Sequence, residues 1–123
     1  MTKIMIVDDD METTSIMESI LKLAGYEPTS VNDSTIAVQT AGRLHPDLFL
    51  LDLMMPEIDG FKLCRLLRAE PEFAHTPIII VTALDDTDSR VVAFGAGADD
   101  YLTKPFHISE LSYRVKDLLS KTE

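Results

Sequence analysis

The sequence predicts a three-layer α/β domain in which a parallel five-stranded sheet is covered by helices on both faces. Five short apolar runs alternate along the chain with segments of helical spacing. Apart from a weaker second run, they are apolar throughout, a pattern typical of parallel strands that are buried on both faces. Together, the alternation and the apolar strands predict a doubly wound α/β fold.

The predicted strands are short, and the second is the least apolar of them. Each is followed by a polar or glycine-containing segment before the next helical pattern begins. They cover Ile4–Val7, Glu27–Val31, Leu48–Leu51, Ile78–Val81 and Tyr101–Leu102.

Five helices are predicted between and after these strands, because apolar residues recur there at intervals of three and four. Gly25 is expected to end the first helix. Asp10 is expected to cap the first helix, and Asp85, Asp86 and Asp88 to form a solvated start of the fourth. The recurring residues are Ile16, Ile20, Leu23 and Ala24; Ile36, Thr40, Ala41 and Leu44; Phe61, Cys64 and Leu67; Val91 and Phe94; and Ile108, Leu111, Val115 and Leu118.

Composition limits the classes of function. The 123 residues, 46% of them hydrophobic, are enough for one domain with its own core. A net charge of −10 argues against direct binding of nucleic acid. The chain lacks an apolar run of membrane-spanning length and a signal-peptide pattern. Its single cysteine, Cys64, fits a reducing compartment, so we expect a cytoplasmic protein.

Charged and hydroxyl side chains follow the predicted strands, where ligands bind in a doubly wound sheet. Two carboxylates about 4 Å apart repel by roughly 4 kcal/mol near a protein surface. A metal ion, a nearby cation or a helix N-terminus must offset that repulsion, and a lysine follows the fifth predicted strand at the same edge. The sequence therefore predicts a cation site balanced by a lysine. The strand-end residues are Asp8 and Asp9, Asp52, Thr82 and Ala83, and Lys104.

Four segments carry a resemblance to a known family: VDDD, LLDLMMPEIDGF, IIIVTA and GADDYLTKPF. In content and order they resemble the receiver domain of two-component response regulators, over essentially the whole of residues 1–123. The resemblance implies a sheet of order 2-1-3-4-5. It also implies a non-enzymatic switch that accepts a phosphoryl group from a histidine kinase or phosphotransfer protein in a Mg²⁺-dependent reaction.

The resemblance also assigns roles to single residues. Asp52 is the expected phosphoacceptor, and Lys104, joined to Pro105 by a cis bond, contacts the phosphoryl group. The expected Mg²⁺ site consists of Asp9, Asp52 and the main-chain carbonyl of Met54, with Asp8 acting mostly through water. The expected switch consists of the Thr82 hydroxyl, the Ala83 N–H and the Tyr101 ring.

Phosphorylation is expected to reshape the face formed by the fourth helix, fifth strand and fifth helix. Four charged residues on that face match positions that pair across two-fold dimers in DNA-binding members of the family. Alternatively, they are ordinary exposed charges, each pair worth under about 1 kcal/mol. The residues are Arg90, Asp100, Glu110 and Arg114.

Two other functions are open to such a site. A phosphatase that turns over through an aspartyl phosphate needs an acid two residues after the nucleophile, and that position holds Met54. A scaffold without phosphorylation would not need the full set of acids, hydroxyl and lysine.

Asp59 and Gly60 are expected to form a turn with a left-handed glycine after Asp52. We recognise no output segment, such as a DNA-binding segment, after the last predicted helix. The chain is either a stand-alone receiver or one cut from a longer protein, and composition does not decide between them.

Overall fold

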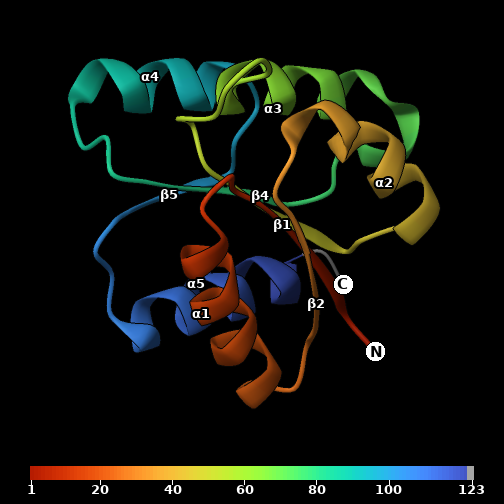
Figure 1. Ribbon diagram of the computed structural model, residues 1–123, viewed down its shortest axis with the longest axis vertical. Helices are drawn as coiled ribbons and strands as arrows, with labels where there is room; N and C mark the ends of the chain where they lie inside the picture. Colours follow the sequence, from red (N-terminus) through yellow and green to blue (C-terminus); the bar gives the residue numbers. More distant parts are fainter. Residues whose placement is uncertain (122–123) are drawn as a thin grey trace.

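A computed structural model of the chain, which describes residues 1–121, contains one parallel sheet of order β2-β1-β3-β4-β5 (Figure 1). This confirms the predicted fold class and strand order. Each strand boundary lies within one residue of the predicted one. The strands are β1 (Lys3–Val7), β2 (Glu27–Val31), β3 (Leu48–Leu51), β4 (Ile78–Thr82) and β5 (Asp100–Thr103).

Helices cover both faces of the sheet (Figure 1). On one face lie α1 (Met11–Leu23) and α5 (Ile108–Lys121). The other face carries α2 (Ala37–Leu44), α3 (Gly60–Ala69) and α4 (Thr87–Gly95). Within residues 1–121, every helix is too short or too polar to cross a lipid bilayer.

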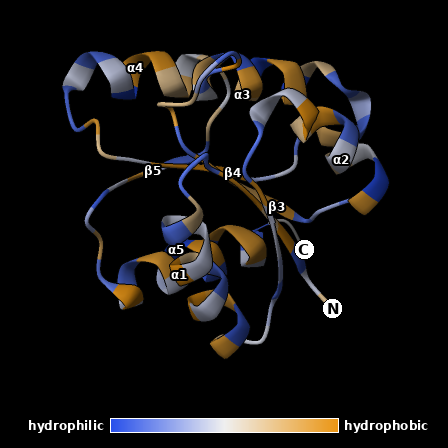
Figure 2. Ribbon diagram, in the orientation of Figure 1, coloured by the Kyte–Doolittle hydropathy of each residue, from blue (hydrophilic) through white to orange (hydrophobic). Residues whose placement is uncertain are grey.

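The central strands β1, β3 and β4 are almost entirely apolar because their successive side chains enter two different cores. Met5 and Val7 of β1 belong to the core under α2, α3 and α4, whereas Ile4 and Ile6 belong to the core under α1 and α5. All four are essentially inaccessible to solvent. Figure 2 shows the consequence: hydrophobic central strands lie between helices that carry both hydrophobic and hydrophilic residues.

Aspartates begin three of the helices, and Asp10 and Asp86 do so as predicted. The Asp10 carboxylate accepts hydrogen bonds from the Glu12 N–H and from the Thr13 hydroxyl. The bond from Thr13 is the main reason that the pKa of the Asp10 carboxyl is lowered. Asp86 accepts from the Ser89 N–H and starts α4 in the same way. Gly25, with φ of 93°, follows the end of α1 as expected.

Helical spacing predicts the positions of the helices correctly and part of their buried faces, such as Cys64 and Leu67 of α3, but it misplaces much of the buried face of α1. In α1 the buried residues are Thr14, Met17, Ile20 and Leu21, while Ile16 and Leu23 are 52% and 89% exposed. The buried stripe follows the contact with the sheet and α5, which the sequence alone does not define. Other apolar residues of the predicted helical patterns are also exposed: Ile36, Val91, Phe94 and Ile108.

The prediction of a left-handed Gly60 is wrong. Among the described residues, the glycines with positive φ are Gly25 and Gly97, and the left-handed residue of this loop is Glu57. Gly60 is instead the first residue of α3, after its N-cap Asp59. A Cβ at Gly60 would lie 2.1 Å from the Asp52 carbonyl oxygen, so glycine is needed here for close packing of main chain on main chain.

We therefore expect Gly60→Ala to lower the free energy of unfolding by about 1–3 kcal/mol, because the end of β3 must move away from α3. Gly42→Ala in α2 is the matched control. No atom lies within 4 Å of a Cβ there, so that variant should gain about 0.5–1 kcal/mol from helix propensity. Urea unfolding followed by circular dichroism measures both. A Gly60→Ala protein as stable as the parent would contradict the steric argument.

Candidate functional site

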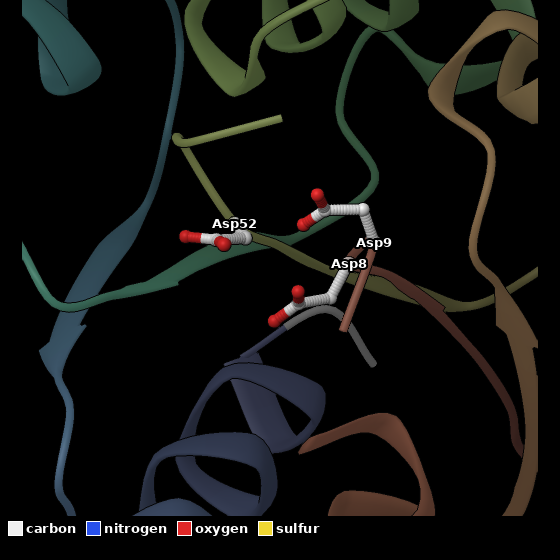
Figure 3. A group of neighbouring side chains, drawn as sticks. All are labelled: Asp8, Asp9 and Asp52. Carbon is white, nitrogen blue, oxygen red and sulfur yellow. The ribbon is translucent and has the colours of Figure 1, made fainter. Parts of the chain in front are cut away.

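The carboxyl ends of β1 and β3 bring three carboxylates to one edge of the sheet. Figure 3 shows the side chains of Asp8, Asp9 and Asp52 gathered around a common space. Each offers a carboxylate oxygen, and these oxygens all lie within 4.8 Å of one another. Two of the three acids, Asp8 and Asp52, are buried. The structure thus brings together the acids that the sequence predicted to form a cation site.

Lys104, which follows β5, supplies the positive charge nearest to these acids. Its Nζ atom lies 2.7 Å from Oδ2 of Asp8 and 3.6 Å from Oδ2 of Asp52. The Asp8 side chain is 1% exposed, and its Oδ1 accepts a hydrogen bond from the Asp10 N–H at 3.0 Å. One lysine against three ionised acids leaves a formal charge of −2, so the site still favours a further cation.

Asp52 differs from Asp8 because one of its oxygens has no partner. Its Oδ1 is buried and accepts no hydrogen bond from any described residue. Burial raises the pKa of the Asp52 carboxyl, and the charge of Asp8 raises it further, against the opposing effect of Lys104. A buried, unpartnered carboxylate oxygen is costly, and it leaves a lone pair available to an incoming cation or electrophile.

The acids fit a magnesium ion in their chemistry. Mg²⁺ prefers oxygen ligands and is commonly held by one or two carboxylates together with water. Asp8, Asp9 and Asp52 supply only oxygen donors, and one of these donors is the unpartnered Oδ1 of Asp52. The donor set and the residual negative charge therefore match a hard divalent cation.

At the ends of β4 and β5, Leu84 links two of the predicted switch residues. The Thr82 hydroxyl oxygen accepts from the Leu84 N–H at 3.4 Å, and the Tyr101 hydroxyl donates to the Leu84 carbonyl at 2.5 Å. Thr82 and Tyr101 are both buried, whereas Ala83, which follows Thr82 in the chain, is exposed. Both side chains thus act on the main chain of the same residue.

Arg90 of α4 holds the Tyr101 ring from outside. Its guanidinium carbon lies 4.6 Å from the centre of the ring, and its Nη2 donates to the Thr103 hydroxyl at 2.9 Å. The sequence identified Arg90 only as a candidate dimer residue and gave no sign of this contact. The other candidates also have contacts within the chain, since Arg114 pairs with Asp100 at 2.6 Å and Glu110 accepts from the His107 N–H.

The segment after β5 has the predicted backbone. The Lys104–Pro105 peptide bond is cis. The Lys104 N–H donates to the Thr82 carbonyl at 2.8 Å, which ties this segment to the end of β4. Asn32, which the sequence analysis did not single out, donates from its side chain to the Asp8 carbonyl at 2.8 Å.

Comparison with known proteins agrees with this architecture. The family model described as response regulator receiver domain matches residues 4–116. The DNA-binding dual master transcriptional regulator RpaA of Synechocystis is 40% identical over 123 residues, which are 100% of this chain and 51% of that protein. The chain spans about half the length of the curated relatives that it matches.

Solved structures are similar over almost their whole length. A putative response regulator from Chloroflexus aurantiacus is 39% identical, with a TM-score of 0.92 over 97% of this chain and 98% of that one. The receiver domain of the sensor histidine kinase PA1611 from Pseudomonas aeruginosa is 33% identical, with a TM-score of 0.89 over 97% and 98%. The latter was solved with a magnesium ion coordinated in its active-site cleft.

The burial of Asp52 leads to a stability prediction for the metal-free protein. We expect Asp52→Asn to raise the free energy of unfolding at pH 7, in buffer with EDTA, by about 1 kcal/mol, because the variant buries no charge. The folded pKa lies above the ordinary value of 3.8, so the parent loses stability as pH rises through the interval between these two values. The advantage of the variant should therefore be complete above this interval and absent below it.

Asp85→Asn is the matched control, because it removes the same charge from an exposed position. Urea titrations of the three proteins across the acidic range give the comparison. If Asp52→Asn gained no more stability than Asp85→Asn, the buried charge would not carry the cost assigned to it.

Proposed function

The chain belongs to the response regulator receiver family, and from that premise we propose that it is a phosphorylation switch with Asp52 as its phosphoacceptor. Receiver domains of this family accept phosphoryl groups and act as signalling switches in two-component systems. The observation that carries the assignment to Asp52 is its buried, unpartnered Oδ1 among the gathered acids. Asp9 is exposed, and both oxygens of Asp8 are already hydrogen-bonded, so neither is an equivalent nucleophile.

In the proposed reaction, a carboxylate oxygen of Asp52 forms a bond to phosphorus as the bond from phosphorus to the donor breaks. The donor is a phosphohistidine of a histidine kinase or phosphotransfer protein, and the leaving imidazole keeps the electron pair. Lys104 lies close enough to Asp52 to contact the transferred group and offset its charge. Transfer to a carboxylate depends mainly on such positioning and charge compensation.

We further propose that the acids hold Mg²⁺ through Asp9, Asp52 and the main-chain carbonyl of Met54, with Asp8 acting through water. When bound, the ion neutralises negative charge on the acceptor and on the incoming phosphoryl group. The support from this chain is the oxygen-only donor set and the free Oδ1 of Asp52. Asp8, whose oxygens bond to Lys104 and to the Asp10 N–H, suits the less direct role.

An enzyme that turns over through an aspartyl phosphate is a weaker candidate. Met54, two residues after Asp52, is 56% exposed beside the site and carries no group that can transfer a proton. The proposed function is therefore a stoichiometric switch that acts on an output domain or a partner. The curated relatives are about twice as long as this chain, which leaves room in them for such a domain. The net charge of this chain disfavours its direct contact with nucleic acid.

We propose that phosphorylation changes the shape of the face formed by α4, β5 and α5, and that this face controls the output domain or partner. A phosphoryl group on Asp52 would accept hydrogen bonds from the Thr82 hydroxyl and the Ala83 N–H. Movement of Thr82 toward that group would stretch the long bond that its oxygen accepts from the Leu84 N–H. Leu84 also bonds to Tyr101, so the rearrangement reaches the ring beneath Arg90. Tyr101 is already buried in this structure, so the proposed rearrangement begins from a buried ring.

Incubation with acetyl phosphate and Mg²⁺ tests the function directly. We expect a mass gain of one phosphoryl group per chain, which EDTA prevents and Asp52→Asn abolishes because the acceptor oxygen is lost. Asp85→Asn is the control of equal charge and should be modified like the parent. Modification that persists in Asp52→Asn would sink the assignment, and repeated turnover of an external phosphoester would favour the enzyme.

Sedimentation tests the output face. With beryllofluoride and Mg²⁺ as a phosphoryl mimic, we expect the parent to move from monomer to dimer, because Arg90, Asp100, Glu110 and Arg114 can pair twice across a two-fold axis. Thr82→Ala should bind the mimic but remain monomeric, since the hydroxyl that couples the site to Leu84 is missing. A parent that stays monomeric, or a variant that dimerises equally well, contradicts this coupling.

A further inference from the structure

Asp8 has a hydrogen-bond partner at each of its polar groups. Its N–H donates to the Val31 carbonyl at 3.2 Å, and its carboxylate accepts from the Asp10 N–H and from Lys104. Its main-chain carbonyl accepts from Nδ2 of Asn32 at 2.8 Å. Among these four interactions, only the bond from Asn32 acts on the peptide that joins Asp8 to Asp9.

The peptide between Asp8 and Asp9 determines where the Asp9 main chain lies. The Asp9 side chain is exposed, and no hydrogen bond or ion pair within the described part of the chain restrains it. Because a peptide group is planar, fixing the Asp8 carbonyl also fixes the position of the Asp9 nitrogen and Cα. The Asp9 carboxylate, which extends from this Cα, lies close to that of Asp52 (Figure 3).

Asn32 is itself held in place on two sides. It directly follows β2, whose last residue Val31 pairs with Val7 at the end of β1. Its Nδ2 also donates to the Thr14 hydroxyl at 3.2 Å, and Thr14 is a buried residue of α1 that donates to the Met11 carbonyl. The amide thus lies between α1 and the end of β1, with one N–H available for each.

We propose that Asn32 is a positioning residue for the cation site: it fixes the Asp8–Asp9 peptide and so holds the Asp9 carboxylate toward Asp52. The inference rests on the proposed function for the identity of the cation, Mg²⁺. The contrasting interpretation is that Asn32 only joins β2 to α1 through Thr14. The two interpretations differ in what happens to cation affinity when each hydrogen bond is removed separately.

Isothermal titration calorimetry with Mg²⁺ alone, without any phosphodonor, separates them. We expect Asn32→Ala to weaken Mg²⁺ binding about tenfold, in the range typical for residues that orient metal ligands. Thr14→Val, the matched control, removes the other bond of Asn32 but leaves its bond to Asp8, and should bind Mg²⁺ like the parent. Urea unfolding in EDTA reports the stability of each apoprotein independently. If Asn32→Ala does not fold, Asn32→Leu, of similar size and without a donor, replaces it with the same expectation.

Phosphorylation by acetyl phosphate gives a second readout. The Mg²⁺ concentration for half-maximal rate should rise by the same factor in Asn32→Ala, while the rate at saturating Mg²⁺ is retained. Unchanged Mg²⁺ affinity in Asn32→Ala, or an equal loss in Thr14→Val, overturns the inference and leaves the proposed function intact. A parent chain that binds no Mg²⁺ overturns both.

Discussion

Repulsion among three carboxylates at one sheet edge is the constraint on which the rest of this structure depends. Asp8 and Asp52 are buried with Asp9 beside them, and this arrangement is tolerable only with positive charge at the same place. Lys104 supplies it from a position 96 residues further along the chain than Asp8. The doubly wound topology makes this contact possible, because all five strands direct their carboxyl ends to one edge.

Sequence could predict whatever depends on strand ends, because the end of an apolar run fixes where the next side chain lies. Asp8, Asp52, Thr82 and Lys104 were located in this way, and the structure brings them to a single edge. Features that depend on contacts between distant parts of the chain could not be predicted in this way. Spacing alone could not define the buried face of α1. The sequence also could not show that Gly60 is needed for close packing against the Asp52 carbonyl rather than for a turn.

The edge divides into two parts that are held differently. The acids at the ends of β1 and β3 are anchored by main-chain bonds to neighbouring strands, such as the bond from the Asp52 N–H to the Val7 carbonyl. The ends of β4 and β5 share a main-chain bond from the Lys104 N–H to the Thr82 carbonyl, but here the side-chain hydroxyls of Thr82 and Tyr101 also bond to the main chain of Leu84. Side-chain bonds can exchange partners without breaking the sheet, so rearrangement after phosphorylation is expected in the second part.

Contacts to main-chain atoms constrain Asp52 and the peptide between Asp8 and Asp9. Gly60 allows α3 to approach the Asp52 carbonyl, and Asn32 binds the Asp8 carbonyl, so both constraints act on backbone atoms. A carboxylate oriented by bonds to its own oxygens has fewer lone pairs left for a ligand, as Asp8 illustrates. Orientation through the backbone avoids that competition, because Asp9 and Oδ1 of Asp52 are directed into the site while their oxygens stay free to bind.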